Sequence, residues 1–203
     1  MNILPFDKEN GNCHNIGMRY WWANQNQHTH ETETRGGYLW SPKHRSDGSR
    51  NPFYDNLRLA RNSDMIFAYH DSAIQSVGVV LESAHEAPCP DPPPPPRPDE
   101  KFVSPDMPGW LLDVAWLPLL HPLFPAQHMD LLEPLLPTAH SPLSPTGRGL
   151  QGGRLLELPQ HLAIMLLQLV GGRVHTRLFH SYWRPSQMRL PLDGQPPSFL
   201  PDE

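Results

Sequence analysis

Aromatic, amide and basic side chains gather in the first quarter of the chain. They lie in three short segments, Trp21 to Gln25, Gly37 to Lys43 and Arg50 to Tyr54. Tryptophan faces stack on nucleobases, asparagine and glutamine pair with base edges, and lysine and arginine bind phosphates. The mixture therefore predicts recognition of a planar, hydrogen-bonding ligand. The alternative is that some of these aromatic side chains form a barrel core, because alternate strand residues face opposite ways.

Catalytic patterns are missing from the sequence. It contains no GxSxG, HExxH, P-loop or GxGxxG motif. The acids Asp71, Asp113 and Glu157 are isolated from one another. His28 and His30 would share a face only on a strand, and they lie in a segment that we expect to be a loop, which is a poor setting for zinc. We expect no enzymatic activity, no metal and no cofactor.

Composition indicates one packed domain with poorly ordered segments. The chain has 203 residues, of which 26 are proline and 14 glycine, and only 38% are apolar. No window is long and apolar enough to span a membrane, and Asp7, Lys8 and Glu9 interrupt the region where a signal peptide would be apolar. Two cysteines, Cys13 and Cys89, are too few for a disulfide framework. We expect a cytoplasmic protein.

Charge is distributed unevenly along the chain, although the net charge is −5. Residues 35–61 hold six basic and two acidic side chains, and residues 146–189 hold six basic and one acidic. Residues 62–145, between these blocks, hold two basic and eleven acidic side chains. A fold that joins the basic blocks would create a phosphate-facing surface. Scattered, solvated arginines are the alternative, and composition alone favours it.

Short strands dominate the expected elements. The segments expected to be strands are Arg19–Ala23, Gly37–Trp40, Met65–Tyr69, Ile74–Leu81, Trp110–Leu117 and Leu155–Leu158. Those expected to be helices begin at Asn51-Pro52 or span Gln127–Leu132 and Pro159–Val170. We expect Gln25 to Arg35 to be a long loop and Pro88 to Pro98 to be a polyproline II insertion. Five to six strands with two or three helices favour an α+β fold with a small curved, barrel-like sheet.

Several segments together resemble a known family. They are Met18 to Gln27, Gly36 to Lys43 and Arg50 to Tyr54, with Ile74 to Gly78, Ser141 to Pro145 and Gly149 to Gln151 further along the chain. The combination resembles the EVE domain and, more narrowly, the EVE-like module at the N-terminus of modification-dependent HNH endonucleases. The resemblance covers residues 18–172. It leaves a flexible extension over residues 1–17 and an Arg- and Pro-rich tail over residues 173–203.

The resemblance implies a PUA-like β-barrel that binds a flipped, modified base in an aromatic pocket. The expected ligand is 5-methylcytosine or 5-hydroxymethylcytosine in DNA, read as the specificity module of a modification-dependent restriction system. By the same resemblance, the residues expected to bind the base are Trp22, Asn24, Trp40, Ser41 and Asp71. Those expected to contact the nucleic-acid backbone are Lys43, Arg50 and Arg148.

The chain differs from the endonucleases after Gly172. His175 and His180 stand in the tail without the pattern of an HNH nuclease, whose histidines and asparagine bind a metal. A nuclease fused elsewhere or acting in trans is therefore the expected partner. Two other readings stay open. EVE domains are similar to YTH domains, which read methylated adenine in RNA, so the ligand could be a modified base in RNA. The Pro-rich segment or the tail could instead bind a protein.

Overall fold

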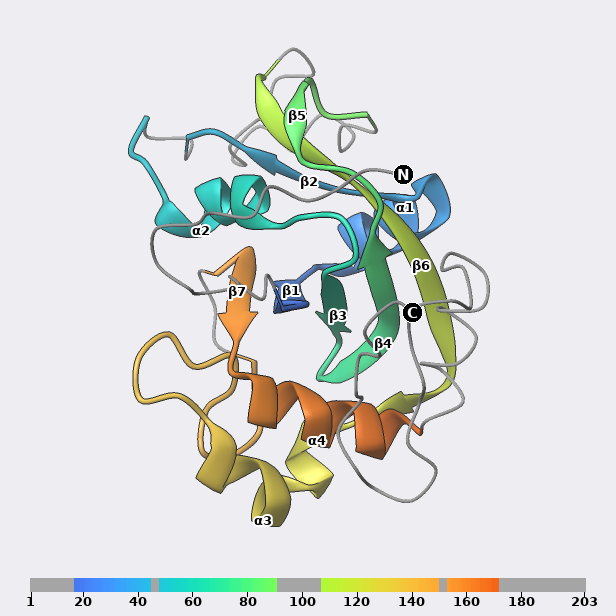
Figure 1. Cartoon of the computed structure of the whole chain (residues 1–203), viewed down its shortest axis with the longest axis vertical. Coiled ribbons are helices and arrows are strands. Elements are labelled where there is room, and N and C mark those ends of the chain that lie inside the picture. Colours follow the sequence, from blue (N-terminus) through green and yellow to red (C-terminus); the bar gives the residue numbers. More distant parts are fainter. Residues whose placement is uncertain (1–16, 45–47, 91–106, 150–152, 172–203) are drawn as a thin grey trace, which may run out of the picture.

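The computed structural model describes residues 17–44, 48–90, 107–149 and 153–171, which form a curled sheet with helices at its ends (Figure 1). The strands are β1 (Tyr20–Asn24), β2 (Tyr38–Pro42), β3 (Met65–His70), β4 (Ala73–Val80), β5 (His85–Ala87), β6 (Gly109–Leu123) and β7 (Leu155–Leu158). The α-helices are α1 (Gln27–Gly36), α2 (Pro52–Asp55), α3 (Met129–Leu132) and α4 (Gln160–Val170). Short 3-10 helices are η1 (Asn56–Leu59), η2 (Pro125–Gln127) and η3 (Glu133–Leu135).

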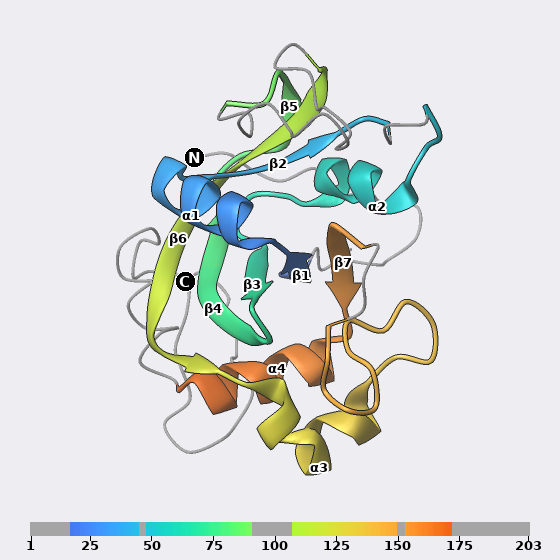
Figure 2. The same ribbon diagram turned by 180° about the vertical axis from the view of Figure 1, so that it is seen from behind.

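The strands form one mixed sheet in the order β2-β6-β4-β3-β1-β7, and β5 also pairs with β6. Strands β1 and β3 are parallel, and the other pairs are antiparallel. Strand β6 is 15 residues long and pairs with β2 and β5 near its start and with β4 further along. It therefore runs along both parts of the curl (Figures 1 and 2). The half-barrel confirms the expected α+β class and is consistent with a PUA-like barrel.

Strand β1 is buried on both faces because it lies between β3 and β7 and apolar side chains cover each side. Trp22 packs in one cluster with Phe67 and the apolar face of α4. Trp21 points the other way and packs with Leu39 and Leu57. Neither tryptophan is exposed to solvent. Successive strand residues point to opposite faces, so the adjacent tryptophans contribute to different cores.

Helix α1 corrects the expectation of a loop over Gln25 to Arg35. The Asn26 side chain accepts a hydrogen bond from the Thr29 N–H, and the Thr29 hydroxyl accepts one from the Asn26 N–H. This reciprocal capping box starts the helix, and Gly37, with a φ of 74°, ends it in a left-handed conformation. The helix is held by its caps and by the polar contacts described below. It has no apolar stripe, so the sequence pattern does not predict it.

Most other elements follow the sequence-based expectations. The turn at Asp71-Ser72, strand β7 and helix α4 are confirmed, as is the Asn51 cap, whose side chain accepts from the Phe53 N–H. Strand β5 was not expected, and β2 includes Ser41-Pro42, where we expected a stop. Residues 91–98 of the Pro-rich insertion, residues 1–16 and residues 172–203 lie outside the described part. Among the described helices, none has the length and apolar character needed to cross a bilayer.

Gly78 allows close packing between β4 and β6. A Cβ atom at this position would lie 2.5 Å from the Val114 side chain and 2.6 Å from the Trp116 ring. Glycine at this position therefore leaves room for two side chains of β6. The register shifts of this sheet lie elsewhere on β3 and β4.

Asp64 anchors the parallel pair of β1 and β3. Its carboxylate accepts hydrogen bonds from the Arg19 N–H at 2.9 Å, the Trp21 indole N–H at 2.9 Å and the Arg61 N–H at 3.0 Å. The residue is only 4% exposed. A buried carboxylate with three N–H donors is well satisfied, and each donor loses its acceptor if the carboxylate is removed. Asp64 therefore holds the start of β1 against the start of β3.

We expect Asp64→Ala to lower the free energy of unfolding by about 3 kcal/mol, because the buried Trp21 indole N–H and two partly buried backbone N–H groups lose their acceptor. Urea unfolding followed by tryptophan fluorescence measures this change. Glu82→Ala, which removes an exposed carboxylate, is the control and should change stability by less than about 0.5 kcal/mol. Equal stabilities of the two variants would contradict the anchoring role.

Candidate functional site

A buried ion pair joins α1 to the residue just before β7. The Arg154 guanidinium contacts the Glu33 carboxylate, and their side chains are 12% and 3% exposed. Arg154 also donates to the Trp40 carbonyl from Nε at 3.0 Å and from Nη2 at 2.9 Å, and to the Asn24 carbonyl from Nη1 at 2.8 Å. One side chain therefore ties together the end of β1, the middle of β2 and helix α1.

Both oxygens of the Glu33 carboxylate accept hydrogen bonds. Its Oε1 accepts from the Trp40 N–H at 2.8 Å, and its Oε2 accepts from the Gln25 side-chain amide at 2.8 Å. Buried charges are tolerated only when paired and hydrogen-bonded, and both conditions are met here. The sequence analysis missed both residues. The Asn26 and Thr29 capping pair was the available signal, because it places Glu33 on a helix.

Trp22 and Asn24 form the first part of the candidate site. The Trp22 ring packs against Tyr69 with centroids 4.8 Å apart, and its indole N–H donates to the Asn24 side-chain oxygen at 3.0 Å. The Asn24 amide nitrogen donates to the Gly153 carbonyl at 2.7 Å. Both ends of this amide thus contact the protein itself. Trp22 is fully buried, so no face of its ring is open to a ligand in this structure.

Trp40 and Ser41 form the second part of the candidate site. Trp40 is 8% exposed, its indole N–H donates to the Ala87 carbonyl at 3.1 Å, and its ring lies against Gly109, where a Cβ would collide with it. Ser41 is completely buried, and its hydroxyl has no hydrogen-bond partner in the described part of the chain. A buried hydroxyl without a partner carries a free-energy cost, and the Ser76 hydroxyl on β4 shares this condition.

The loop before β7 closes over the end of β3. Within it, Leu143 and Gly149 form an isolated bridge, and the Gly149 N–H donates to the Tyr69 hydroxyl at 2.9 Å. This contact brings the loop beside Tyr69, the ring that packs on Trp22. The segment Ser141 to Pro145, which carries part of the family resemblance, therefore lies near the first part of the candidate site.

The remaining predicted site residues do not contact Arg154 or Glu33 in the described part of the chain. Asp71 is exposed in the turn between β3 and β4, with a φ of 48°. Lys43 pairs with Glu86 at 2.5 Å, and Arg50 pairs with Asp55 at 3.0 Å. Arg148 is exposed in the loop before β7. The structure thus links the backbones of Asn24 and Trp40 through Arg154, and the roles proposed for all the predicted site residues stay predictions.

A histidine pair continues the polar network. The His30 and His70 rings stack with centroids 5.2 Å apart and an angle of 2° between planes, and His30 Nδ1 lies 2.9 Å from the Gln25 side-chain oxygen. Gln25 directs its NH₂ group to Glu33, so its oxygen faces His30, whose Nδ1 must then carry the hydrogen. Burial and the neighbouring His70 lower the pKa of His30, and Glu31 opposes them.

The structure shows how His28 and His30 are placed. No group of three or more histidine, cysteine or acidic side chains that could hold a metal occurs among the residues that the structure describes. His28 and His30 lie on α1, a helix, where the sequence analysis considered a shared face only for a strand. The stacked pair therefore contributes a titratable group to the packing of α1.

Known proteins resemble this chain in fold. No protein-family model and no curated protein matches it. Among solved structures, a hypothetical protein from Leishmania major shares 11% identity over 77% of this chain and 97% of its own, with a TM-score of 0.50. A Pseudomonas putida protein shares 19% identity over 74% and 99%, with a TM-score of 0.46. The Pho92 YTH domain, in complex with m6A, shares 11% over 75% and 86%, with a TM-score of 0.46. Membership of the EVE family stays a prediction.

We expect Glu33→Ala or Arg154→Ala to cost about 3–5 kcal/mol of stability, because each leaves the other charge buried and unpaired. The double variant should cost much less than both losses together. Chemical unfolding of all four proteins gives the coupling energy. The exposed pair of Arg50 and Asp55 is the matched control, with an expected coupling below about 1 kcal/mol. Additive losses at the buried pair would contradict its structural role.

We expect stability to fall as the pH drops below about 6.5, the range in which an ordinary histidine binds a proton. Since the pKa of His30 is lowered in the folded protein, the unfolded chain takes up this proton more readily. The contribution of His30 to the free energy of unfolding is therefore fully present above about pH 6.5 and is lost as the pH falls through the lowered pKa of His30. Urea unfolding between about pH 7 and about pH 5 measures the slope.

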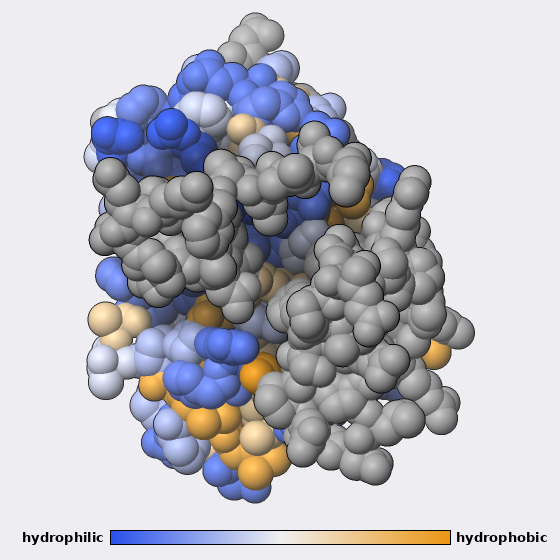
Figure 3. Space-filling model, in the orientation of Figure 1, coloured by the Kyte–Doolittle hydropathy of each residue, from blue (hydrophilic) through white to orange (hydrophobic). Residues whose placement is uncertain are grey.

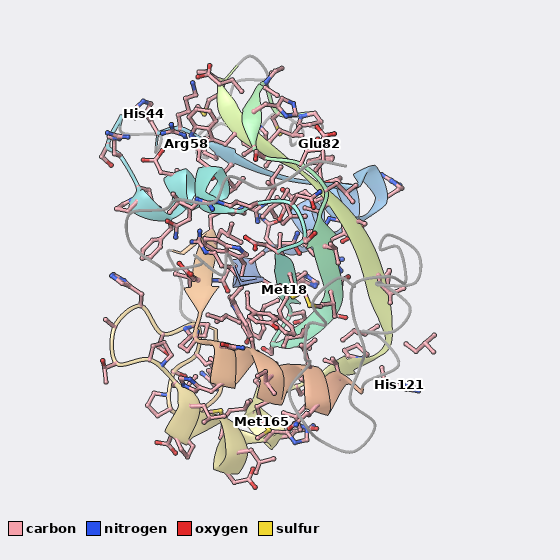
Figure 4. The ribbon with its side chains drawn as sticks, viewed as in Figure 1. Met18, His44, Arg58, Glu82, His121 and Met165 are labelled. Atoms are coloured by element: carbon pink, nitrogen blue, oxygen red, sulfur yellow. The ribbon has the colours of Figure 1, made fainter. Side chains whose placement is uncertain are left out.

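His30→Gln should flatten this pH dependence, because the titrating ring is removed and an amide replaces it. His121→Gln is the matched control, because His121 is exposed and points away from the sheet at its edge (Figure 4). The same slope in the His30 variant and in the unaltered protein would rule out His30 as the source.

Proposed function

We propose that this domain reads a modified base in nucleic acid, with a flipped 5-methylcytosine or 5-hydroxymethylcytosine in DNA as its ligand. The Ser41 hydroxyl carries the proposal. It is fully buried beside Trp40 and lacks a hydrogen-bond partner in the part of the chain that the structure describes. A base edge offers donors and acceptors that would satisfy this hydroxyl.

Preorganisation supports the same proposal. Arg154 and Glu33 hold the backbone of Trp40 through its N–H and its carbonyl, so the segment that carries Trp40 and Ser41 has a set geometry. A site that is already ordered loses little conformational entropy when a ligand binds. The pairing of Trp22 with Asn24 gives the neighbouring end of β1 a comparable rigidity. We assign stacking to Trp40, because the Trp22 face is covered by Tyr69.

Magnitudes limit how the modification can be read. Burial of one methyl group contributes about 0.8 kcal/mol, and a pocket that selects for a methyl discriminates by about 10–200-fold. Extrusion of a base from a duplex costs a few kcal/mol. Stacking and phosphate contacts must therefore supply most of the affinity, while the pocket biases the choice between bases. We expect modest affinity that weakens strongly with salt.

We further propose that the chain recognises its ligand and does not cleave it. Cleavage would come from an HNH nuclease, fused elsewhere or acting in trans, as in modification-dependent restriction. Measurable metal-dependent cleavage of DNA by the purified chain would contradict this part of the proposal. Matched oligonucleotides of DNA and RNA, each with and without the modified base, separate the proposed ligand from a modified base in RNA.

We expect Ser41→Ala to weaken binding to a 5-methylcytosine duplex by roughly tenfold, the value of one buried hydrogen bond to a ligand. Stability should not fall, because the lost hydroxyl has no partner in the described residues. Fluorescence anisotropy with modified and unmodified duplexes of one sequence measures the effect. Ser76→Ala is the matched control, because Ser76 on β4 is equally buried and its hydroxyl also lacks a described partner.

The Ser76 variant should bind like the unaltered protein. Equal effects of the two substitutions, or none from Ser41→Ala, would contradict a ligand contact at Ser41. Gly109→Ala provides a second test, since a methyl group there displaces the Trp40 ring without removing it. We expect it to weaken binding to the modified duplex, and unchanged binding would remove Trp40 from the site.

A further inference from the structure

Two cations share one indole ring beside the candidate site. The Lys43 ammonium lies 4.5 Å from the centre of the Trp110 ring, and the Arg58 guanidinium carbon lies 4.8 Å from it. Lys43 directly follows β2, Trp110 lies at the start of β6 and Arg58 lies in η1. Sequence reasoning singled out neither Trp110 nor Arg58, because 52 residues separate them in the chain and no local pattern connects them.

The two cations differ in how they are neutralised. Lys43 is paired with Glu86 at 2.5 Å. Arg58 is exposed, and no carboxylate pairs with it in the described ranges of the chain. A guanidinium that stacks on an indole keeps its N–H edge directed outward, and that edge matches two oxygens of a phosphate. The cluster therefore holds a net positive charge and an ordered donor without an acceptor.

The position of Trp110 places this cluster next to the candidate base site. Trp110 is the cross-strand partner of Ser41 in the antiparallel pair of β2 and β6. Directly opposed residues have Cβ atoms about 5 Å apart on the same face. The unpartnered hydroxyl and the ring that carries the cations are thus immediate neighbours. Arg58 lies with His44 at one edge of the molecule, where hydrophilic colours dominate the surface (Figures 3 and 4).

We propose that Arg58, held on Trp110 and supported by Lys43, binds a backbone phosphate beside the recognised base. This inference rests on the proposed function and extends it to the sugar-phosphate backbone. Arg58 forms a charge-assisted, bidentate contact that carries no base information. It raises the affinity for modified and unmodified nucleic acid alike, whereas the pocket at Ser41 biases the choice between them.

The first test compares Arg58→Ala with the unaltered chain on modified and unmodified duplexes over a series of sodium chloride concentrations. We expect the affinity for both duplexes to fall by the same factor, roughly five- to tenfold. The ratio between the duplexes should not change, and the slope of log K against log salt should become shallower by about 1. Arg58→Lys should recover part of the affinity, since it keeps the charge and loses the bidentate fork.

Arg35→Ala is the matched control, because Arg35 is an exposed arginine in the last turn of α1 and is not one of the cations over the Trp110 ring. Its affinity and its salt slope should equal those of the unaltered protein. Equal effects of Arg58→Ala and Arg35→Ala would mean that Arg58 contributes only non-specific electrostatic attraction, and would overturn the proposal. A loss confined to the modified duplex would overturn it as well, because it would make Arg58 part of base selection.

A second measurement does not depend on base recognition. Inorganic pyrophosphate is titrated into the chain, with sodium chloride at equal ionic strength as the reference, and the tryptophan indole N–H signals are followed by NMR. Trp110→Phe identifies the Trp110 signal. We expect pyrophosphate to shift this signal, and we expect Arg58→Ala to abolish the shift. A signal that does not move overturns the phosphate site even if the duplexes bind. A shift without discrimination between duplexes refutes the base reader and keeps the phosphate site.

Discussion

The rest of this structure depends on one buried ion pair, between Glu33 and Arg154. Helix α1 has no apolar stripe, so hydrophobic packing cannot hold it on the sheet. The carboxylate of Glu33 holds it instead, because it binds both Arg154 and the Trp40 N–H. Removal of two charges from water is unfavourable, and the hydrogen bonds to Gln25, Asn24 and Trp40 offset that cost. These hydrogen bonds are all made in this one arrangement, so the network also fixes how α1, β1 and β2 are placed relative to one another.

The sequence predicted the elements that bury an alternating or continuous apolar pattern. Strands β3, β4 and β7 and helix α4 carry such patterns, and their boundaries agree closely with the structure. Helix α1 escaped prediction because its stabilising contacts are caps and a long-range ion pair, neither of which leaves a periodic signal. We expected strand β6 to end at Leu117, before Pro118, but it continues to Leu123. The proline is tolerated because the pairing of β6 with β4 becomes irregular next to it.

The sequence predicted which residue types gather in this region but not which of them are buried. The family resemblance named both Trp22 and Trp40 as base-binding residues. In the structure, Trp22 is a core residue that packs on Tyr69 and fixes Asn24, while Trp40 stands next to an unpartnered buried hydroxyl. The distinction depends on which strand lies at the centre of the sheet, and strand order is a property of the whole fold. Contacts such as that of Arg58 with Trp110 depend on the fold in the same way.

A chain with a net charge of −5 is an unusual nucleic-acid binder if charge is counted over the whole molecule. At physiological salt, however, exposed charges are largely screened beyond about 8 Å, so local arrangement outweighs the total. The cations at Trp110 meet this condition, because an aromatic ring holds them in place within one small area. In the proposed reader, affinity therefore comes from a local cationic cluster and selectivity from the neighbouring hydroxyl and indole. Since Ser41 and Trp110 are paired across two strands, the two contributions are set by a single strand register. A slip of β2 by one residue would turn Ser41 to the opposite face and separate it from Trp110.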